Sequence, residues 1–292
     1  MPDALVIDKR LVRRSFERAA SSYDAAAVLQ NEICRRMLAR LDYIKLAPAT
    51  ILDAGSGTGN AVAGLLQRYS GARLIALDLA LGMVTRARAR ESWWRRLAGG
   101  GRLAAVCGDF EQLPLAGSTT QLVWSNLALQ WINEPQHAFA EMHRVLAPGG
   151  LLLFSTFGPD TLKELRTAFA DTDRHTHVNR FIDMHDIGDR LVACGYSDPV
   201  MDMEVVTLTY ANVRGLMRDL KAIGAHNLTQ GRPGALAGRS FMSRVTQNYE
   251  VFRREGTLPA TFEVVYGHAW KPAPRVSPTG HPVIEIKPRS GG

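Results

Sequence analysis

The chain has 292 residues, of which 46% are hydrophobic, and it carries a formal net charge of +7. This size and apolar content allow one large core with a small additional subdomain. The three cysteines form no C-x-x-C pair and no metal-ligand spacing, which argues against a zinc site and favours core cysteines in a reducing compartment. Charges among the first ten residues argue against a signal peptide or membrane anchor, so a cytoplasmic protein is expected.

Strands and helices are predicted to alternate along the first half of the chain, a pattern typical of a parallel sheet wrapped by helices. Residues 10–40 are expected to form N-terminal helices, with Asp24 as a cap. The predicted strands cover residues 50–52, 72–79, 103–106, 122–127 and 151–154. The predicted helices cover residues 58–69, 81–96 and 135–146, and a Pro-Gly-Gly turn is expected at residues 147–150.

The pattern changes after residue 157. Helical segments are predicted at residues 160–169, 183–194, 213–223 and 237–254, and two further strands at residues 199–208 and 259–270. We expect these helices to cover the open end of the sheet as a substrate lid. The predicted parts are N-terminal helices over the cofactor site (1–48), a cofactor-binding core (49–158), the remaining strands with the lid (159–270) and a flexible tail (271–292).

A glycine-rich turn at residues 55–59 joins the first predicted strand to a helix. Its glycines, Gly55, Gly57 and Gly59, let the backbone turn tightly and approach a ligand closely. A phosphate-binding P-loop would need Gly-Lys-Ser/Thr at the end of this turn, and none is present. A dinucleotide site has the pattern G-x-G-x-x-G, but the third glycine here comes one position early, which weakens an NAD site without abolishing it.

Acidic side chains stand at three successive strand ends. Asp53 lies beside the glycine turn, Asp78 ends the next strand, and Asp109 follows the third strand together with Phe110. Asp78 is positioned to accept hydrogen bonds from ribose hydroxyls, while Asp109 and Phe110 offer an acid and an aromatic face to an adenine. S-adenosylmethionine (SAM) contains both groups and no phosphate, so these residues predict a SAM site.

The string from residue 51 to 59 resembles the first motif of class I SAM-dependent methyltransferases, which implies a Rossmann-like α/β sheet flanked by helices. Further strings resemble the malonyl-acyl-carrier-protein O-methyltransferases of biotin synthesis, the BioC family. They lie at residues 16–20, 23–24, 125–131, 154–158, 177–181 and 184–188. The resemblance covers roughly residues 10–270 and implies methylation of the free carboxylate of a malonyl thioester.

The resemblance also implies roles for individual residues. Tyr23 is expected to close the SAM pocket. Asn126 and Gln130 follow the fourth strand, where Asn126 is expected to contact the cofactor and Gln130 is expected to contact the acceptor. Met83 either covers an adenine face or fills a gap in the core. Trp131 and Phe157 either exclude water near the methyl group or belong to the core. The expected cofactor-binding residues are therefore Tyr23, Asp53, Gly55, Gly57, Asp78, Met83, Asp109, Phe110 and Asn126.

Methyl transfer to a carboxylate asks little of the protein. A carboxylate has a reference pKa of about 3.3–4.3, is ionised at neutral pH and needs no general base. We therefore expect no catalytic base, and no zinc or serine-hydrolase motif is present. A carboxylate buried beside the cofactor does need a cation, and the candidate is Arg180, with His177 and Asn179 as auxiliary donors.

The positive net charge favours an acidic partner, and the resemblance implies an acyl-carrier protein. Two basic clusters are candidate docking faces or solvated surfaces: one around Arg86, Arg88 and Arg90 with residues 95–96, the other comprising Arg214, Arg218 and Lys221. No nucleic acid or membrane partner is expected. The alternatives left open are an RNA methyltransferase, an enzyme for another small carboxylic acid, and a SAM-binding regulator without turnover.

Overall fold

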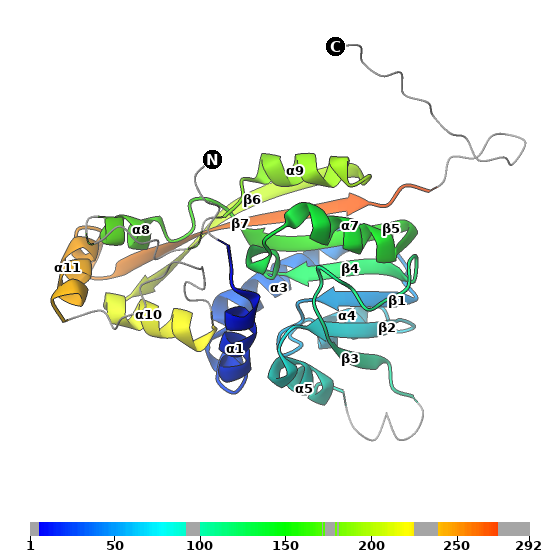
Figure 1. The fold of residues 1–292 in the computed structure, drawn as a ribbon, viewed down its shortest axis with the longest axis horizontal. Coiled ribbons are helices and arrows are strands. Elements are labelled where there is room, and N and C mark those ends of the chain that lie inside the picture. The colour runs from blue at the N-terminus through cyan, green and yellow to red at the C-terminus, as the bar shows by residue number, and fades with distance from the viewer. Residues whose placement is uncertain are drawn as a thin grey trace, which may run out of the picture.

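A seven-stranded sheet forms the centre of the computed structural model, with the order β3-β2-β1-β4-β5-β7-β6 (Figure 1). The structure describes residues 6–91, 100–170, 172, 179, 181–224 and 239–273. The strands are β1 (Thr50–Ala54), β2 (Arg73–Asp78), β3 (Leu103–Cys107), β4 (Thr120–Asn126), β5 (Leu146–Phe157), β6 (Ser197–Tyr210) and β7 (Leu258–Trp270). The first five pair in parallel, and β7 runs antiparallel between β5 and β6. The predicted α/β fold is confirmed.

The central strands bury side chains on both faces, because successive residues of a strand point to opposite sides. Ile51 belongs to the core on one face of the sheet and Leu52 to the core on the other. The same alternation separates Leu122 from Val123 on β4. This arrangement explains why these strands read as continuous apolar runs in the sequence.

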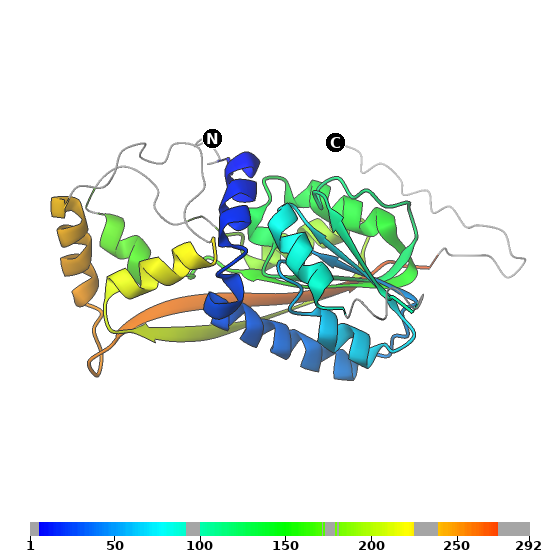
Figure 2. The same cartoon turned by 90° about the horizontal axis from the view of Figure 1, so that it is seen from below.

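Helices cover both faces of the sheet. Figure 2 shows α3 and α4 along one face, and their apolar residues share a core with Ile51. Residues of α7 and α9 share the core on the opposite face with Leu52. The helices are α1 (Lys9–Ala19), α2 (Tyr23–Ala26), α3 (Val28–Arg40), α4 (Val62–Arg68), α5 (Leu81–Ala89), α7 (Pro135–Val145), α8 (Lys163–Ala170), α9 (Met184–Ala193), α10 (Val213–Ala222) and α11 (Arg239–Glu250), with short 3-10 turns η1 (Leu41–Tyr43) and η2 (Leu129–Trp131).

Strands β6 and β7 extend well beyond the rest of the sheet (Figure 1). The pairing of β5 with β7 ends at Phe157 and Val264, whereas β6 and β7 stay paired as far as Tyr210 and Leu258. Helices α8, α10 and α11 gather on this two-stranded extension. Helix α9 instead packs beside α7 on the sheet, so the four helical segments of the second half do not form one unit.

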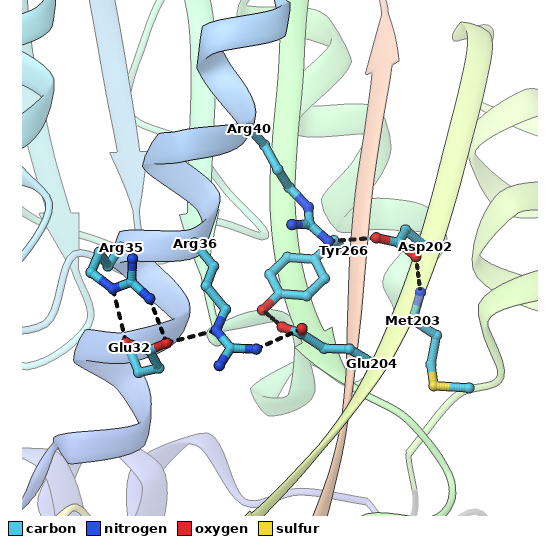
Figure 3. Close-up of polar contacts among 8 residues, drawn as sticks. All are labelled: Glu32, Arg35, Arg36, Arg40, Asp202, Met203, Glu204 and Tyr266. Carbon is cyan, nitrogen blue, oxygen red and sulfur yellow. Dashed lines mark hydrogen bonds and ion pairs between the residues drawn. The ribbon is translucent and has the colours of Figure 1, made fainter.

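A network of charged and aromatic groups joins α3 to β6 and β7 (Figure 3). Arg36 forms ion pairs with Glu32 at 2.7 Å and with Glu204 at 2.6 Å, and the same Glu204 accepts a hydrogen bond from the hydroxyl of Tyr266. The guanidinium of Arg40 lies 3.8 Å from the centre of the Tyr266 ring. Since Tyr266 is almost fully buried, this network fixes the position of α3 across the sheet.

Several element boundaries differ from the prediction. The expected turn at 147–150 lies within β5, where the amide of Gly149 donates to the carbonyl of Lys271 and the amide of Lys271 donates to Gly150. Long-range pairing therefore overrides the local turn signal of Pro-Gly-Gly. The helix expected at 58–69 begins only at Val62, because residues 58–61 complete the turn after β1.

The predicted C-terminal tail is described only at its first residues. Of the predicted tail, residues 274–292 lie outside the described residues. The amino group of Lys271 donates to the carbonyls of His143 at 2.8 Å and Leu146 at 2.7 Å, so the start of this segment is attached to the sheet. Within the described ranges, no helix has the length and apolar character needed to cross a membrane.

Candidate active site

The glycine turn after β1 has the backbone conformation that the sequence predicted. Gly55, Gly57 and Gly59 have φ values of +79°, +53° and +81°, which residues with a side chain rarely adopt. A Cβ atom on Gly55 would lie 2.3 Å from the Cβ of Ala128. The turn is held against β2 by the amide of Gly55, which donates to the carbonyl of Leu77 at 2.8 Å. Glycine is therefore required at position 55 for both conformation and space.

Asp78 connects this turn to the end of β2. Its carboxylate accepts hydrogen bonds from the amides of Gly57 and Ala80, both at 2.9 Å. Burial raises the pKa of Asp78 to about 6, although these amide donors oppose the shift. Each carboxylate oxygen keeps further acceptor capacity, so Asp78 can still receive hydroxyl donors from a ligand.

A pocket with an empty volume of about 780 Å³ opens at the carboxyl ends of the parallel strands. Its location is where open α/β sheets bind ligands. Ten of the predicted site residues line it: Tyr23, Gly55, Gly57, Asp78, Asp109, Phe110, Asn126, Gln130, Trp131 and Phe157. The structure thus brings together most of the side chains assigned separately to cofactor and acceptor.

Two other predicted residues, Met83 and Asn179, are described but do not line the pocket. Met83 packs in a small apolar cluster with Ala20 and Ala80, which fits a gap-filling role rather than contact with an adenine. Asn179 is buried, and its side-chain oxygen has no hydrogen-bond partner among the described residues. His177 and Arg180 lie outside the described residues.

Asp53 is also away from the pocket wall. It is 2% exposed, and one of its carboxylate oxygens has no hydrogen-bond partner in the described part of the chain. Burial, together with the negative charge of Asp78, raises the pKa of Asp53 to about 8. At neutral pH Asp53 is therefore mostly protonated and uncharged, and it does not line the pocket in this arrangement.

Tyr23 approaches the glycine turn from the N-terminal helices. A Cβ atom on Gly57 would lie 3.8 Å from the Tyr23 ring, an ordinary van der Waals distance, so the ring stands next to the turn and the positive φ, not space, favours glycine there. Burial, with the neighbouring charges of Asp78 and Asp24, raises the pKa of the Tyr23 hydroxyl, which therefore stays protonated at neutral pH.

The prediction that Asp24 caps a helix is wrong. Asp24 stands in the first turn of α2, where it accepts a hydrogen bond from the hydroxyl of Thr58 and pairs with Arg90 at 2.7 Å. These contacts fasten α2 to the glycine turn and to the end of α5. The cap found in α1 is Asp8, which accepts from the amides of Arg10 and Leu11.

Three side-chain amides line the pocket, those of Asn126, Gln30 and Gln130. Asn126 donates from Nδ2 to the main-chain carbonyl of Gln30 at 3.1 Å and accepts from the hydroxyl of Ser155 at 2.9 Å, so its orientation is fixed. The side-chain oxygens of Gln30 and Gln130 are buried without a hydrogen-bond partner among the described residues. Because buried acceptors are normally satisfied, they indicate a ligand that carries hydrogen-bond donors.

Sequence reasoning missed the part of the wall formed by α1. Lys9 pairs with Asp109 at 2.5 Å and also with Glu111. Phe16 meets Trp131 edge to face, with ring centres 5.3 Å apart. The amphipathic pattern of α1 signals one buried face, but it cannot tell that this face meets residues about one hundred positions away.

Comparisons with known proteins identify the family. A family model described as a methyltransferase domain matches residues 52–154. A malonyl-[acyl-carrier protein] O-methyltransferase from Gallionella capsiferriformans is 58% identical over 280 residues, covering 96% of this chain and 97% of that protein. A protein of the same name from Methylovorus is 56% identical, covering 99% and 98%. The chain belongs to the malonyl-[acyl-carrier protein] O-methyltransferase family.

Solved structures agree with this family at the level of the fold. The YcgJ protein of Bacillus subtilis has a TM-score of 0.56 at 14% identity, covering 82% of this chain and 99% of that protein. A putative methyltransferase from Bacillus halodurans has a TM-score of 0.55 at 18% identity, covering 81% and 99%. The family and the matched domain confirm that this malonyl-[acyl-carrier protein] O-methyltransferase family member is a SAM-dependent methyltransferase.

Proposed function

We propose that this protein transfers the methyl group of SAM to the free carboxylate of a malonyl thioester on an acyl-carrier protein, giving the methyl ester that starts the synthesis of the pimeloyl part of biotin. The observation that carries the proposal is the identity of 56–58% over nearly the whole chain to relatives named malonyl-[acyl-carrier protein] O-methyltransferase. The pocket supports it, because its acids and its apolar wall suit the two halves of such a reaction.

The cofactor half of the proposal follows the order of the strands. Asp109, Asp78 and Asn126 stand at the carboxyl ends of β3, β2 and β4, so a ligand with adenine at β3 and ribose at β2 ends near β4. The methionine part of SAM would then lie beside Asn126 and Gln30. We assign the unpaired Gln30 oxygen to the ammonium group of SAM, because it can only accept a hydrogen bond.

The acceptor half needs dryness and alignment more than acid-base chemistry. Bound SAM supplies an electrophilic methyl group next to a positive sulfur. Phe16, Trp131 and Phe157 provide an apolar wall that limits water around the acceptor carboxylate. Alignment of the two reactants can contribute on the order of 7–11 kcal/mol through effective concentration. One carboxylate oxygen then forms the bond to the methyl carbon as the carbon–sulfur bond breaks, with no proton transfer.

The cation that pairs with the acceptor carboxylate remains a separate part of the proposal. Among the described residues that line the pocket, Lys9 is the single cationic side chain, and it is already paired with two acids. We therefore keep Arg180 as the proposed partner, with His177 and Asn179 as auxiliary donors. Arg180→Ala should raise the KM for the acceptor and leave SAM affinity unchanged.

An acceptor panel tests the function. Protein incubated with methyl-labelled SAM is offered malonyl-carrier protein, malonyl-coenzyme A and free small dicarboxylic acids. We expect transfer to the malonyl thioester that mild ester hydrolysis releases. Transfer to free acids alone would identify another carboxyl methyltransferase, and SAM binding without transfer to any acceptor would identify a regulator. Either result would refute the proposed substrate.

Substitution of Gln30 by leucine tests the assignment of its side-chain oxygen. The main-chain carbonyl that holds Asn126 is unchanged in this variant, so the pocket should keep its shape. Loss of a hydrogen bond to a charged group should cost about 1.5–3 kcal/mol and raise the Kd for SAM about 10- to 150-fold. Gln67→Leu, at an exposed position on α4, is the matched control. Equal SAM affinity of the two variants, measured by calorimetry, would remove Gln30 from the site.

A further inference from the structure

Two basic helices meet beside the mouth of the pocket. Helix α1 and the turn after it are joined to the end of α10 and the residues that follow it. The Ser15 hydroxyl donates to the carbonyl of Gly224 at 3.2 Å, and the Ser22 hydroxyl donates to the carbonyl of Ala222 at 3.3 Å. Figures 1 and 2 both show the end of α10 beside α1. We call this junction the seam. Phe16 and Ile223 stand at the seam and line the pocket.

Both helices carry exposed positive charges that have no ion-pair partner in the described part of the chain. On α10, Arg214, Arg218 and Lys221 are exposed and follow a spacing of four and three residues, which places them on one face. On α1, Arg14 and Arg18 are exposed and four residues apart. None of the five forms an ion pair with any residue that the structure describes.

On each helix at least one of these charges lies close in the sequence to the seam. Arg18 is three residues from Ser15, and Arg218 is four residues from Ala222, so each arginine neighbours a residue that forms the seam. The acids of the same helices have other partners. Glu17 accepts from the amide of Gly82 at 3.0 Å, and Asp219 is hydrogen-bonded to Tyr210.

From this arrangement we infer that Arg14 and Arg18 of α1, with Arg214, Arg218 and Lys221 of α10, form one docking face for the acidic surface of the acyl-carrier protein. The inference rests on the proposed function and adds the place where the partner binds. A carrier protein presents its acyl group at the end of an arm, so it must dock where that arm can enter the pocket. Complementary charge at this position would orient the carrier and speed its encounter.

The other basic cluster predicted from the sequence, around Arg86, Arg88 and Arg90, is less suited to this role. Arg90 is already paired with Asp24, and Arg88 has a partner of its own. Residues 95 and 96 lie outside the described residues. The helix α5 that carries Arg86 also contributes no residue to the pocket wall.

Two acceptors with the same reacting group separate docking from chemistry. Malonyl-carrier protein tests the docking face, whereas malonyl-pantetheine presents the thioester without the carrier and without phosphate charges. The variants of the full-length protein are the doubles Arg14→Glu/Arg18→Glu and Arg214→Glu/Arg218→Glu. The control is Arg73→Glu, which reverses the charge of an exposed arginine at the amino end of β2, whereas the pocket lies at the carboxyl ends of the strands.

We expect each double variant to raise the KM for malonyl-carrier protein about tenfold or more at low salt, because like charges then face each other. This difference should shrink at high salt. The KM for malonyl-pantetheine and the Kd for SAM should match those of the unsubstituted protein, which also shows that the variants fold. Arg73→Glu should leave all three constants unchanged.

The results that would overturn the docking face differ from the result that would refute the proposed function. An unchanged KM for malonyl-carrier protein in both double variants, or an equal rise in Arg73→Glu, overturns the docking face. Binding of transfer RNA that is lost in the double variants while carrier kinetics are unchanged also overturns it and assigns the face to nucleic acid. Absence of methyl transfer to either malonyl acceptor by the unsubstituted protein refutes the proposed function instead.

Discussion

Acidification through the ionisation range of Asp78 is predicted to weaken SAM binding. The pKa of Asp78 is about 6 without ligand, and donors from a ribose together with a positive sulfur would lower it in the complex. The ionised form therefore binds better, and affinity is complete above the ligand-free pKa and falls below it. At pH 5 about one Asp78 in eleven is ionised, so the Kd should rise about tenfold from its value at pH 7, or about 1.4 kcal/mol.

Calorimetric titration of SAM between pH 7 and pH 5 measures this dependence directly. Asp78→Asn should bind SAM about 10- to 150-fold more weakly at pH 7, because a charged acceptor is lost, and its Kd should be flat over this range. Asp53 does not confuse the result, since with a pKa of about 8 it is mostly protonated throughout. Asp160→Asn, an exposed position, should keep the full dependence. The same pH slope in Asp78→Asn as in the unsubstituted protein would refute the reasoning.

Two further substitutions have matched controls. Gly55→Ala places a Cβ 2.3 Å from the Cβ of Ala128 at a φ of +79°, and should cost about 1–3 kcal/mol of unfolding free energy and weaken SAM binding, whereas Gly71→Ala has open space and should do neither. Tyr266→Phe removes the buried hydroxyl donor of the α3 network and should lower the free energy of unfolding in urea by about 1.5–3 kcal/mol. Tyr43→Phe, 91% exposed, should change it little; equal stability of these two variants would contradict the role of the network.

The parts of the fold that could be predicted are those encoded by short stretches of chain. A buried strand followed by glycines is a local signal, and Gly55, Gly57 and Asp78 were placed at the pocket from such signals alone. The strand ends had to meet, because parallel strands present their carboxyl ends at one edge of the sheet. Geometry at the scale of a few residues therefore determined this half of the site.

The remaining features depend on partners distant in the sequence. Asp24 resembled a helix cap, but its partner Arg90 lies 66 positions away. Lys9 and Gln30 carried no motif, and they reach the pocket only because α1 and α3 pack against the sheet. Similarly, the antiparallel insertion of β7 between β5 and β6 has no signal in the apolar pattern, since a fully buried strand reads the same in either direction.

The hydrogen bond between Gln30 and Asn126 has a consequence for the evolution and engineering of this enzyme. It joins residues 96 positions apart, and one of them lies before the segment 52–154 that matches the methyltransferase domain. A protein shortened to that segment would lose one wall of the pocket proposed to hold the cofactor. Exchange of the first forty residues between relatives should therefore alter cofactor retention and acceptor choice together, even when the catalytic core is left untouched.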